Sequence, residues 1–461
     1  MIQLEKMTFE SFLLRINEML VDSEESHLFS WTEKIEPFAP IALFQRAEET
    51  GKDRIFWMNS THDFSIVGIG ATEKIIAEKD RYTTLQRKWS DVIRSATVFD
   101  PYKKEGTGLI ALGGMTFDPL HEESGVWESF PTSQLTVPTY SFVQHHDNYY
   151  VTVTQKVTSS IDVQQVLSEF ASYKQFVHAT YTDSDYHTVL SKEEEDCPGW
   201  LQSVEEAITE IKQGRAGKIV LARLLRAHLS DKADLSGMLA RLKKTQPTSY
   251  LFAVEHGDDC FIGATPERLI QVKGDDVLST CLAGTAPRGK TATEDEKIAD
   301  DLFNDEKNRE EHEHVVQMIR RAIEPFCMNI DIPDEPTVYR LRNLHHLYTP
   351  VRATLKEKGS LFAMIEALHP TPALGGVPRD YALEFIREHE SVNRGWYGAP
   401  IGWVDHSGNS EFAVAIRSGL VRKDEALLFA GCGVMRDSDP QLELEETGIK
   451  FLPMLNVLED K

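Results

Sequence analysis

The chain has 461 residues, of which 41% are hydrophobic and 26% are charged, the composition of an ordinary globular protein. This apolar share excludes an intrinsically disordered chain, and 28 glycines and 20 prolines without a period exclude a fibrous one. The 49 lysines and arginines against 73 aspartates and glutamates leave a formal net charge of −24. A field this negative repels phosphate backbones, so nucleic acid is not expected as a partner. Any small anionic ligand must therefore be held by a local group of positive charges or by a metal ion.

Cysteine usage and the N-terminal segment both indicate a cytoplasmic protein. The cysteines are far apart and form no CxxC pair, so neither a disulfide framework nor a zinc ribbon is expected; they are Cys197, Cys260, Cys281, Cys327 and Cys432. Residues 1–20 carry acids throughout their apolar stretch, unlike a signal peptide. No uninterrupted apolar run approaches the roughly 20 residues that a membrane-spanning helix needs. We therefore expect a cytoplasmic protein without a membrane partner.

In the first half of the chain, strand-like segments are mixed with helical ones. Apolar or alternating runs predict strands over residues 41–47, 64–71, 108–117 and 150–157, and residues 82–96 have helical periodicity. The polar stretch 191–200 is the nearest approach to a domain boundary, since no Gly/Ser/Pro-rich linker divides the sequence.

Helices and strands alternate more clearly after residue 198. Pro198 near the start, Gly214 at the end and apolar residues at helical spacing predict a helix over 198–214. The following segments predict a strand over 218–227, a helix over 235–244, strands over 250–256, 412–421 and 426–434, and a final helix over 439–455. This interleaving predicts an α/β or α+β sandwich.

The predicted helix over 304–323 carries an acidic residue in an unusual position. Its first turns are rich in acids, which the helix dipole favours, so a solvated acidic face is the simplest interpretation. At 100° per residue, however, Glu311 lies within about 40° of the apolar residues Val315 and Met318. A carboxylate at a core-facing position needs a partner or a metal ion, so both interpretations stay open.

The final helix presents a second acidic pair. Asp439 and Pro440 are a good N-cap and first-turn residue. Glu443, Glu446 and Lys450 follow at spacings of three and four, which places them on one helical face. This pattern fits a surface Glu–Lys pair, and it also fits two carboxylates that help to hold a hard divalent cation.

Two basic residues stand in predicted strands. Arg417 follows Ala413 and Ala415 on one face of the 412–421 segment, where it could form a structural ion pair or clamp a carboxylate. Lys218 opens an apolar strand, where burial could make it a base, although an edge lysine that protects a strand is equally common.

Several segments, in order along the chain, match the motifs of one enzyme family. They are GKIVLAR (217–223), ATPERL (264–269), LAGT (282–285), EKNREEHEHV (306–315), HHLYTP (345–350), HPTPALGG (369–376), FAVAIR (412–417), AGCGV (430–434) and EETGIK (445–450). In these segments the chain resembles the chorismate-utilising enzymes, and most closely the isochorismate synthases. The resemblance implies one large α/β (α+β) fold of two layered β-sheets with helices outside. Residues 1–195, matched more loosely, would complete that fold, and residues 196–461 would form the chorismate-binding catalytic region.

The resemblance also implies roles for individual residues. Lys218 matches the general base that activates water at ring carbon 2, and Glu267 matches the general acid that protonates the hydroxyl leaving carbon 4. Glu311 and Glu446 match the magnesium-binding carboxylates, with Glu443 and Asn308 beside them, although several relatives have an acid where Asn308 stands. The positions that match the substrate pocket are Gly284, Thr285, His346, Ala373, Tyr397, Arg417, Gly431, Gly433 and Lys450.

The physical chemistry agrees with magnesium as the implied cofactor. Chorismate is a dicarboxylate and the protein is strongly negative, so Mg²⁺ between Glu311, Glu446 and a substrate carboxylate would remove a large repulsion. Adding water at one ring carbon while expelling hydroxide from another requires a base and an acid. Lys218 and Glu267 have the chemistry for those two tasks.

The reaction within the family is indicated by the pair Ala373-Leu374. Amino-transferring and lyase relatives usually have Thr-Val there, so the pair indicates water as the nucleophile and isochorismate as the product, without an amidotransferase subunit. The chain length suits the menaquinone branch. The alternatives are a salicylate synthase, an anthranilate or aminodeoxychorismate-type synthase, a siderophore-pathway isochorismate synthase, and an inactive chorismate-binding paralogue, against which the intact Lys218 and Glu267 argue.

Overall fold

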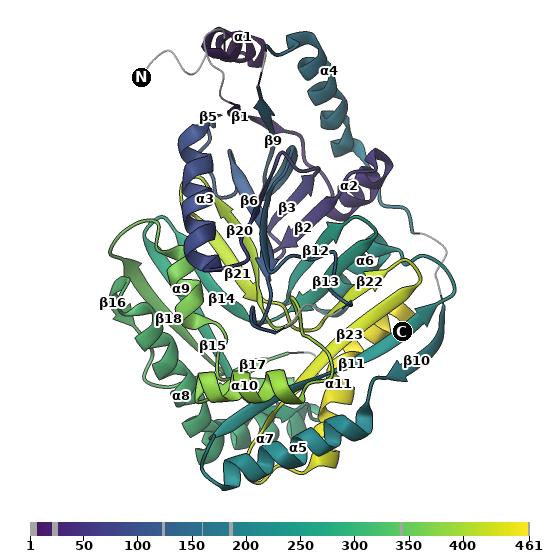
Figure 1. The fold of residues 1–461 in the computed structure, drawn as a ribbon, viewed down its shortest axis with the longest axis vertical. Coiled ribbons are helices and arrows are strands. Elements are labelled where there is room, and N and C mark those ends of the chain that lie inside the picture. The colour runs from purple at the N-terminus through teal and green to yellow at the C-terminus, as the bar shows by residue number, and fades with distance from the viewer. Residues whose placement is uncertain are drawn as a thin grey trace.

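The computed structural model describes residues 7–20, 26–121, 125–158, 160–183, 188–341 and 344–459, and these contain two large β-sheets (Figure 1). The first sheet has thirteen strands in the order β10 (Val189–Glu194), β11 (Lys218–Leu229), β23 (Glu425–Val434), β22 (Ser418–Arg422), β13 (Asp259–Thr265), β12 (Tyr250–His256), β2 (Arg54–Met58), β3 (Phe64–Ile69), β8 (Tyr140–His145), β9 (Asn148–Val157), β1 (His27–Ile35) and β5 (Ala96–Phe99), and β19 (Gly376–Val377) pairs with β11. The second has ten strands in the order β16 (Cys327–Asp331), β18 (Leu344–Leu355), β15 (Asp276–Pro287), β14 (Arg268–Lys273), β21 (Ser410–Val414), β20 (Pro400–Asp405), β6 (Ile110–Met115), β7 (Ser133–Val137) and β4 (Glu73–Ile76), and β17 (Thr337–Arg340) pairs with β18.

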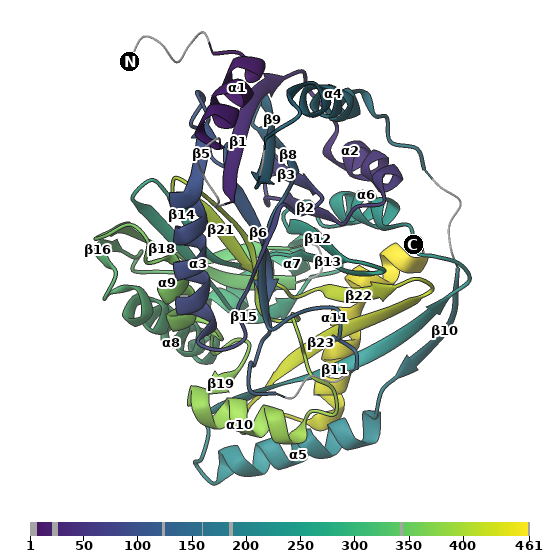
Figure 2. The same ribbon diagram turned by 45° about the horizontal axis from the view of Figure 1, so that its top comes forward.

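Eleven α-helices surround these sheets in the described residues. They are α1 (Phe9–Leu20), α2 (Pro40–Ala47), α3 (Arg81–Ser95), α4 (Val163–Lys174), α5 (Cys197–Lys212), α6 (Leu235–Thr245), α7 (Ala292–Asn304), α8 (Glu306–Ile323), α9 (Leu361–Leu368), α10 (Arg379–His389) and α11 (Pro440–Glu459). Figure 2 shows α3, α8 and α9 along one side of the molecule and α2, α4 and α6 along the other. The predicted class, two layered sheets with helices outside, is confirmed.

Alternating side chains build a separate core on each face of the sheets. On β2, Phe56 and Met58 pack with the helices α1, α2, α4, α6 and α11, whereas Ile55 and Trp57 point into the space between the sheets. On β6, Leu112 enters the same inter-sheet core, whereas Met115 packs with α3, α8 and α9. This period of two is what a strand imposes on its side chains, and it explains why both sheets are buried on both faces.

Strands from the two predicted parts of the chain share both sheets. In the first sheet, β2 pairs with β12 and β10 pairs with β11. In the second sheet, β6 pairs with β20. We propose that residues 1–195 and 196–461 form one structural domain, because their strands depend on each other for hydrogen-bond partners.

Two predicted strands are wrong. Residues 41–47 belong to helix α2, since Pro40 is favoured in a first helical turn and the apolar residues bury on the first sheet and α6. The predicted strand 412–421 is two strands, because the chain leaves the second sheet at Val414 and enters the first at Ser418. The remaining predicted elements are confirmed, with boundaries shifted by a few residues.

Among the described residues, no helix combines the length and the hydrophobicity that crossing a bilayer requires.

Candidate active site

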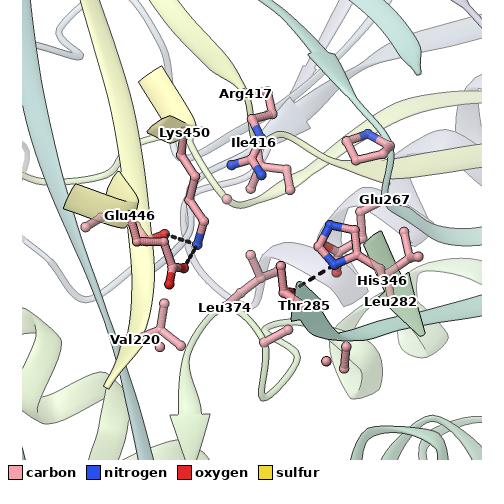
Figure 3. Close-up of a pocket in the computed structure, with 18 of the residues that line it drawn as sticks. Val220, Glu267, Leu282, Thr285, His346, Leu374, Ile416, Arg417, Glu446 and Lys450 are labelled. Carbon is pink, nitrogen blue, oxygen red and sulfur yellow. Dashed lines mark hydrogen bonds and ion pairs between the residues drawn. The ribbon is translucent and has the colours of Figure 1, made fainter. Parts of the chain in front are cut away.

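A cavity of about 270 Å³ lies where the two sheets meet α8 and α11 (Figure 3). Strands β11 and β23 of the first sheet form one wall, and β15 and β18 of the second form another. All the predicted site residues except Glu443 line it: Lys218, Glu267, Gly284, Thr285, Glu311, His346, Ala373, Tyr397, Arg417, Gly431, Gly433, Glu446 and Lys450. Segments as far apart in the sequence as Lys218 and Lys450 therefore converge on one place, as the motifs predict.

Strand alternation places Lys218 in the cavity. Residues 218, 220 and 222 of β11 share one face and all line the cavity, whereas Ile219 and Leu221 pack into the core beside α5. The Lys218 ammonium donates to Glu311 Oε1 of α8 at 2.6 Å. Gly433 of β23 leaves the space for this side chain, because a Cβ there would lie 2.5 Å from Lys218 Cε. The lysine is thus held on the cavity wall by one carboxylate and one missing side chain.

Glu267 lies in the turn between β13 and β14, on the second-sheet side of the cavity. Burial raises the pKa of Glu267 from 4.5 to about 7, although Arg417 and Lys218 act in the opposite direction. A carboxyl group with this pKa carries a proton for much of the time near neutral pH. Glu267 can therefore donate a proton, which an ordinary surface glutamate at that pH cannot.

The raised pKa of Glu267 predicts a pH-dependent effect on stability. Because the folded-state pKa of about 7 lies above 4.5, the stability from this group is fully present below pH 4.5 and is lost as the pH rises through 7. Relative to wild type, Glu267→Gln should therefore gain about 3 kcal/mol of unfolding free energy between pH 4.5 and pH 8. Urea denaturation of both proteins at several pH values measures this difference. A difference that stays constant with pH would contradict the raised pKa.

Cationic side chains line the cavity besides its carboxylates. Arg417 stands at the crossing from β21 to β22 with a φ of +53°, a strained conformation for an arginine that the surrounding structure must hold. Burial lowers the pKa of Arg417, and its charged neighbours include Glu446 and Glu267. Lys450 Nζ lies 2.5 Å from Glu446 Oε1 and donates to Gly431 O at 2.8 Å (Figure 3). With Lys218, these groups make the cavity a place for an anion within a negative protein.

His346 and Tyr397 complete the walls as neutral polar groups. His346 Nδ1 lies 3.0 Å from Thr285 Oγ1, the contact drawn in Figure 3. Burial, with Arg417 and Lys450 nearby, lowers the pKa of His346 to about 3, so the imidazole is neutral at neutral pH. Burial raises the pKa of Tyr397 to about 12, which keeps its hydroxyl protonated. Both side chains can offer hydrogen bonds without adding charge.

The carboxylates of Glu311 and Glu446 suit a magnesium ion by their chemistry. They reach the cavity from two helices, each beside a lysine, and offer the oxygen ligands that Mg²⁺ takes, often one or two carboxylates with water and ligand oxygens. Within the described residues, no cluster of three or more His, Cys, Asp or Glu side chains is placed to hold a metal. Glu443 lies apart from the cavity lining and accepts from Ser438 Oγ at 2.7 Å. The donor set therefore fits a metal shared with a ligand rather than a closed protein cage.

One charged lining residue lies outside the sequence predictions. Arg394 lines the cavity beside Leu374 and forms a buried ion pair with Glu390. A signal was present, since two charged residues four apart stand in the segment before Tyr397. Their spacing did not distinguish a cavity residue from a surface pair.

Comparison with known proteins defines the class of this fold and cavity. The family model described as "Chorismate binding enzyme" matches residues 14–459, and the chain belongs to that family. It is 37% identical over 461 residues to the isochorismate synthase MenF of Bacillus subtilis, covering 98% of each chain. It is 33% identical to the salicylate biosynthesis isochorismate synthase of Pseudomonas aeruginosa, covering 92% of this chain and 89% of the relative. Its fold matches that of the menaquinone-specific isochorismate synthase of Escherichia coli with a TM-score of 0.79 at 23% identity, over 97% of this chain and 98% of that one.

Proposed function

We propose that this protein is an isochorismate synthase, which converts chorismate to isochorismate reversibly and serves menaquinone biosynthesis. The observation that carries the proposal is the cavity itself, in which Lys218 of β11 and Glu267 of the β13–β14 turn line a space that is also lined by Arg394, Arg417 and Lys450. The pKa of about 7 at Glu267 supports the acid role. The name of the B. subtilis relative, an isochorismate synthase, supports the product, and the length of 461 residues suits the menaquinone branch.

In the proposed reaction, Lys218 and Glu267 divide the proton transfers. Lys218 accepts a proton from the water that attacks ring carbon 2, and Glu267 gives a proton to the hydroxyl that leaves carbon 4. In the structure the Lys218 ammonium donates to Glu311; as the base, Lys218 would act as the neutral amine, whose lone pair takes the proton. One water enters and one water leaves, so turnover ends with Lys218 protonated and Glu267 deprotonated, and a proton passes from Lys218 back to Glu267 through solvent before the next turnover.

Arg417 and Lys450 bind the carboxylates of the substrate in this proposal. A guanidinium can engage a carboxylate with two parallel hydrogen bonds, and its buried setting strengthens the interaction. Tyr397 and His346 orient the bound ring with hydrogen bonds.

Glu311 and Glu446 would hold Mg²⁺ in the proposed enzyme. The ion would supply positive charge that offsets the repulsion between a substrate carboxylate and the two protein carboxylates. In the structure, Lys218 pairs with Glu311 and Lys450 pairs with Glu446, so each carboxylate is held at the cavity by a lysine.

The choice of water as nucleophile depends on Ala373 and Leu374, which line the cavity. A methyl group at position 373 cannot hydrogen-bond an incoming amine or orient the substrate for elimination through a hydroxyl. In ¹⁸O-labelled water, wild type should place the label in the ring hydroxyl of isochorismate, with or without ammonium salts. Chromatography with mass detection measures the product spectrum.

Two outcomes of this experiment would contradict the proposal. Anthranilate or aminodeoxychorismate from ammonium, or pyruvate as the main early product, would indicate an amino-transferring or salicylate-forming enzyme. Chorismate left unchanged would indicate an inactive paralogue. As a matched test of the specificity position, the double variant Ala373→Thr, Leu374→Val should release more pyruvate than wild type.

A further inference from the structure

A buried ion pair stands behind the loop that carries Ala373 and Leu374. Glu390 follows directly after α10, and Arg394 lies four residues further on. Their side chains are 2% and 3% exposed, and Arg394 Nε donates to Glu390 Oε2 at 2.9 Å. Burying two charges is expensive unless their remaining hydrogen-bonding atoms are satisfied, so the other contacts of the pair indicate what it is for.

The pair fills a gap in the outer edge of β11. One end of that edge, Lys218 and Ile219, pairs with β19, and the other, Leu225 to Leu229, pairs with β10. Between them, Ala222 N donates to Glu390 Oε1 at 2.7 Å, and Val220 O accepts from Arg394 Nη2 at 2.8 Å. The two side chains thus take the place of a strand along this stretch. Because no strand runs there, the chain before β19 is free to turn into the cavity.

The same guanidinium also holds the turned chain. Arg394 Nη1 donates to Leu374 O at 2.9 Å, one residue before Gly375, whose carbonyl accepts from Val220 N at 3.1 Å. One rigid planar group therefore joins the backbone of Leu374 to the backbone of Val220, two residues from Lys218. A planar guanidinium that donates to both segments fixes the distance and the angle between them, which a single ammonium cannot do.

We propose that Glu390 and Arg394 are positioning residues that set Ala373 and Leu374 relative to Lys218, and thereby restrict the reaction to attack by water. This inference rests on the proposed function, since it names the specificity device of the same cavity. The alternative is that the Glu390–Arg394 pair only stabilises the fold. The positioning role predicts that the ratio of products changes when the pair is altered, and a purely stabilising role predicts that it does not. This ratio separates the two roles because it does not depend on how much protein is folded.

The chain offers a matched control for a purely stabilising role of the pair. Arg54 is also 3% exposed, its Nε donates to Glu255 Oε2 at 2.9 Å, and its Nη1 donates to the carbonyl of Phe44 at 2.9 Å. Arg54 and Glu255 join β2 to β12 and do not line the cavity. Arg54→Lys therefore removes an equivalent fork from an equivalent buried pair elsewhere.

The experiment compares Arg394→Lys, Glu390→Gln and Arg54→Lys with wild type in full-length protein with Mg²⁺. For folded protein, Arg394→Lys and Glu390→Gln should each lose about 10- to 100-fold in kcat/KM, since small misplacements of reacting groups have effects of that size. Their fraction of turnovers that release pyruvate or incorporate ammonia should rise several-fold. Arg54→Lys should lower the thermal midpoint comparably and leave the product fractions at the wild-type values.

The inference is overturned if the product fractions of Arg394→Lys and Glu390→Gln equal those of wild type, or if Arg54→Lys changes them equally. It is also overturned if both Arg394→Lys and Glu390→Gln keep kcat/KM within twofold of wild type. The proposed function fails separately, through a wild-type protein that makes no isochorismate. In that event the chorismate dissociation constant, measured by tryptophan fluorescence, replaces the product ratio. A higher dissociation constant in Arg394→Lys but not in Arg54→Lys supports the positioning role. The same dissociation constant in both variants refutes the positioning role.

Discussion

Replacing Lys218 by alanine, or Glu267 by glutamine, is expected to lower kcat for chorismate by about 10²–10⁴-fold, which corresponds to about 3–5 kcal/mol of barrier. Each substitution removes one of the two proton transfers that the exchange of water for hydroxide requires. Glutamine keeps the shape of Glu267 and cannot supply its proton. The Michaelis constant should change less than kcat, because Arg417 and Lys450 remain to bind the substrate carboxylates. Steady-state kinetics on purified variants measures both constants.

Controls for these variants come from an exposed ion pair outside the cavity. Lys156 Nζ lies 2.6 Å from Glu73 Oε2 on the protein surface. Lys156→Ala and Glu73→Gln should keep wild-type turnover, since exposed pairs contribute little to stability and nothing to the cavity. Circular dichroism and thermal melting should show all four variants folded. Near wild-type turnover in Lys218→Ala or Glu267→Gln would remove that residue from the mechanism.

Removal of divalent cations is expected to abolish turnover. After exhaustive EDTA treatment and exchange into metal-free buffer, activity should fall to the background rate, because the metal charge that would bring a substrate carboxylate next to Glu311 and Glu446 is then missing. Added Mg²⁺ should restore it, and Mn²⁺ should substitute, since both prefer oxygen ligands. Activity titrated against free Mg²⁺ gives the apparent affinity.

Variants at the two carboxylates make the metal prediction residue-specific. Glu311→Gln and Glu446→Gln should each raise the Mg²⁺ concentration needed for half-maximal activity by about tenfold or more. Glu443→Gln should raise it less, because Glu443 contacts Ser438 and lies outside the cavity lining. Full activity in chelator, or equal Mg²⁺ requirements in all three variants, would exclude the proposed metal role of Glu311 and Glu446.

Local sequence patterns predicted most elements because burial repeats with the period of the backbone. The strand over 218–227 corresponds to β11 (Lys218–Leu229), and the strand over 250–256 corresponds to β12. The apolar run 41–47 was wrong because such a short run suits a buried helix as well as a strand, and its neighbours made it α2. The run 412–421 was wrong because the alternation continues on both sides of the crossing between sheets at residues 415–417.

Sequence by itself determined the family, the likeness to isochorismate synthases and the residues that gather in the cavity, since short motifs carry side chains whose chemistry the reaction needs. Only the tertiary structure decided the protonation state of these residues and the contacts that hold them in place. The pKa of Glu267 rises to about 7 through burial among residues from distant segments, and no local pattern contains that burial. Glu443 shares a helical face with Glu446 but bonds Ser438, because the loop before α11 brings that hydroxyl to it. The Glu390–Arg394 pair acquires its contacts with Val220, Ala222 and Leu374 only when β11, β19 and α10 pack together, and long-range packing of this kind is absent from any window of the sequence.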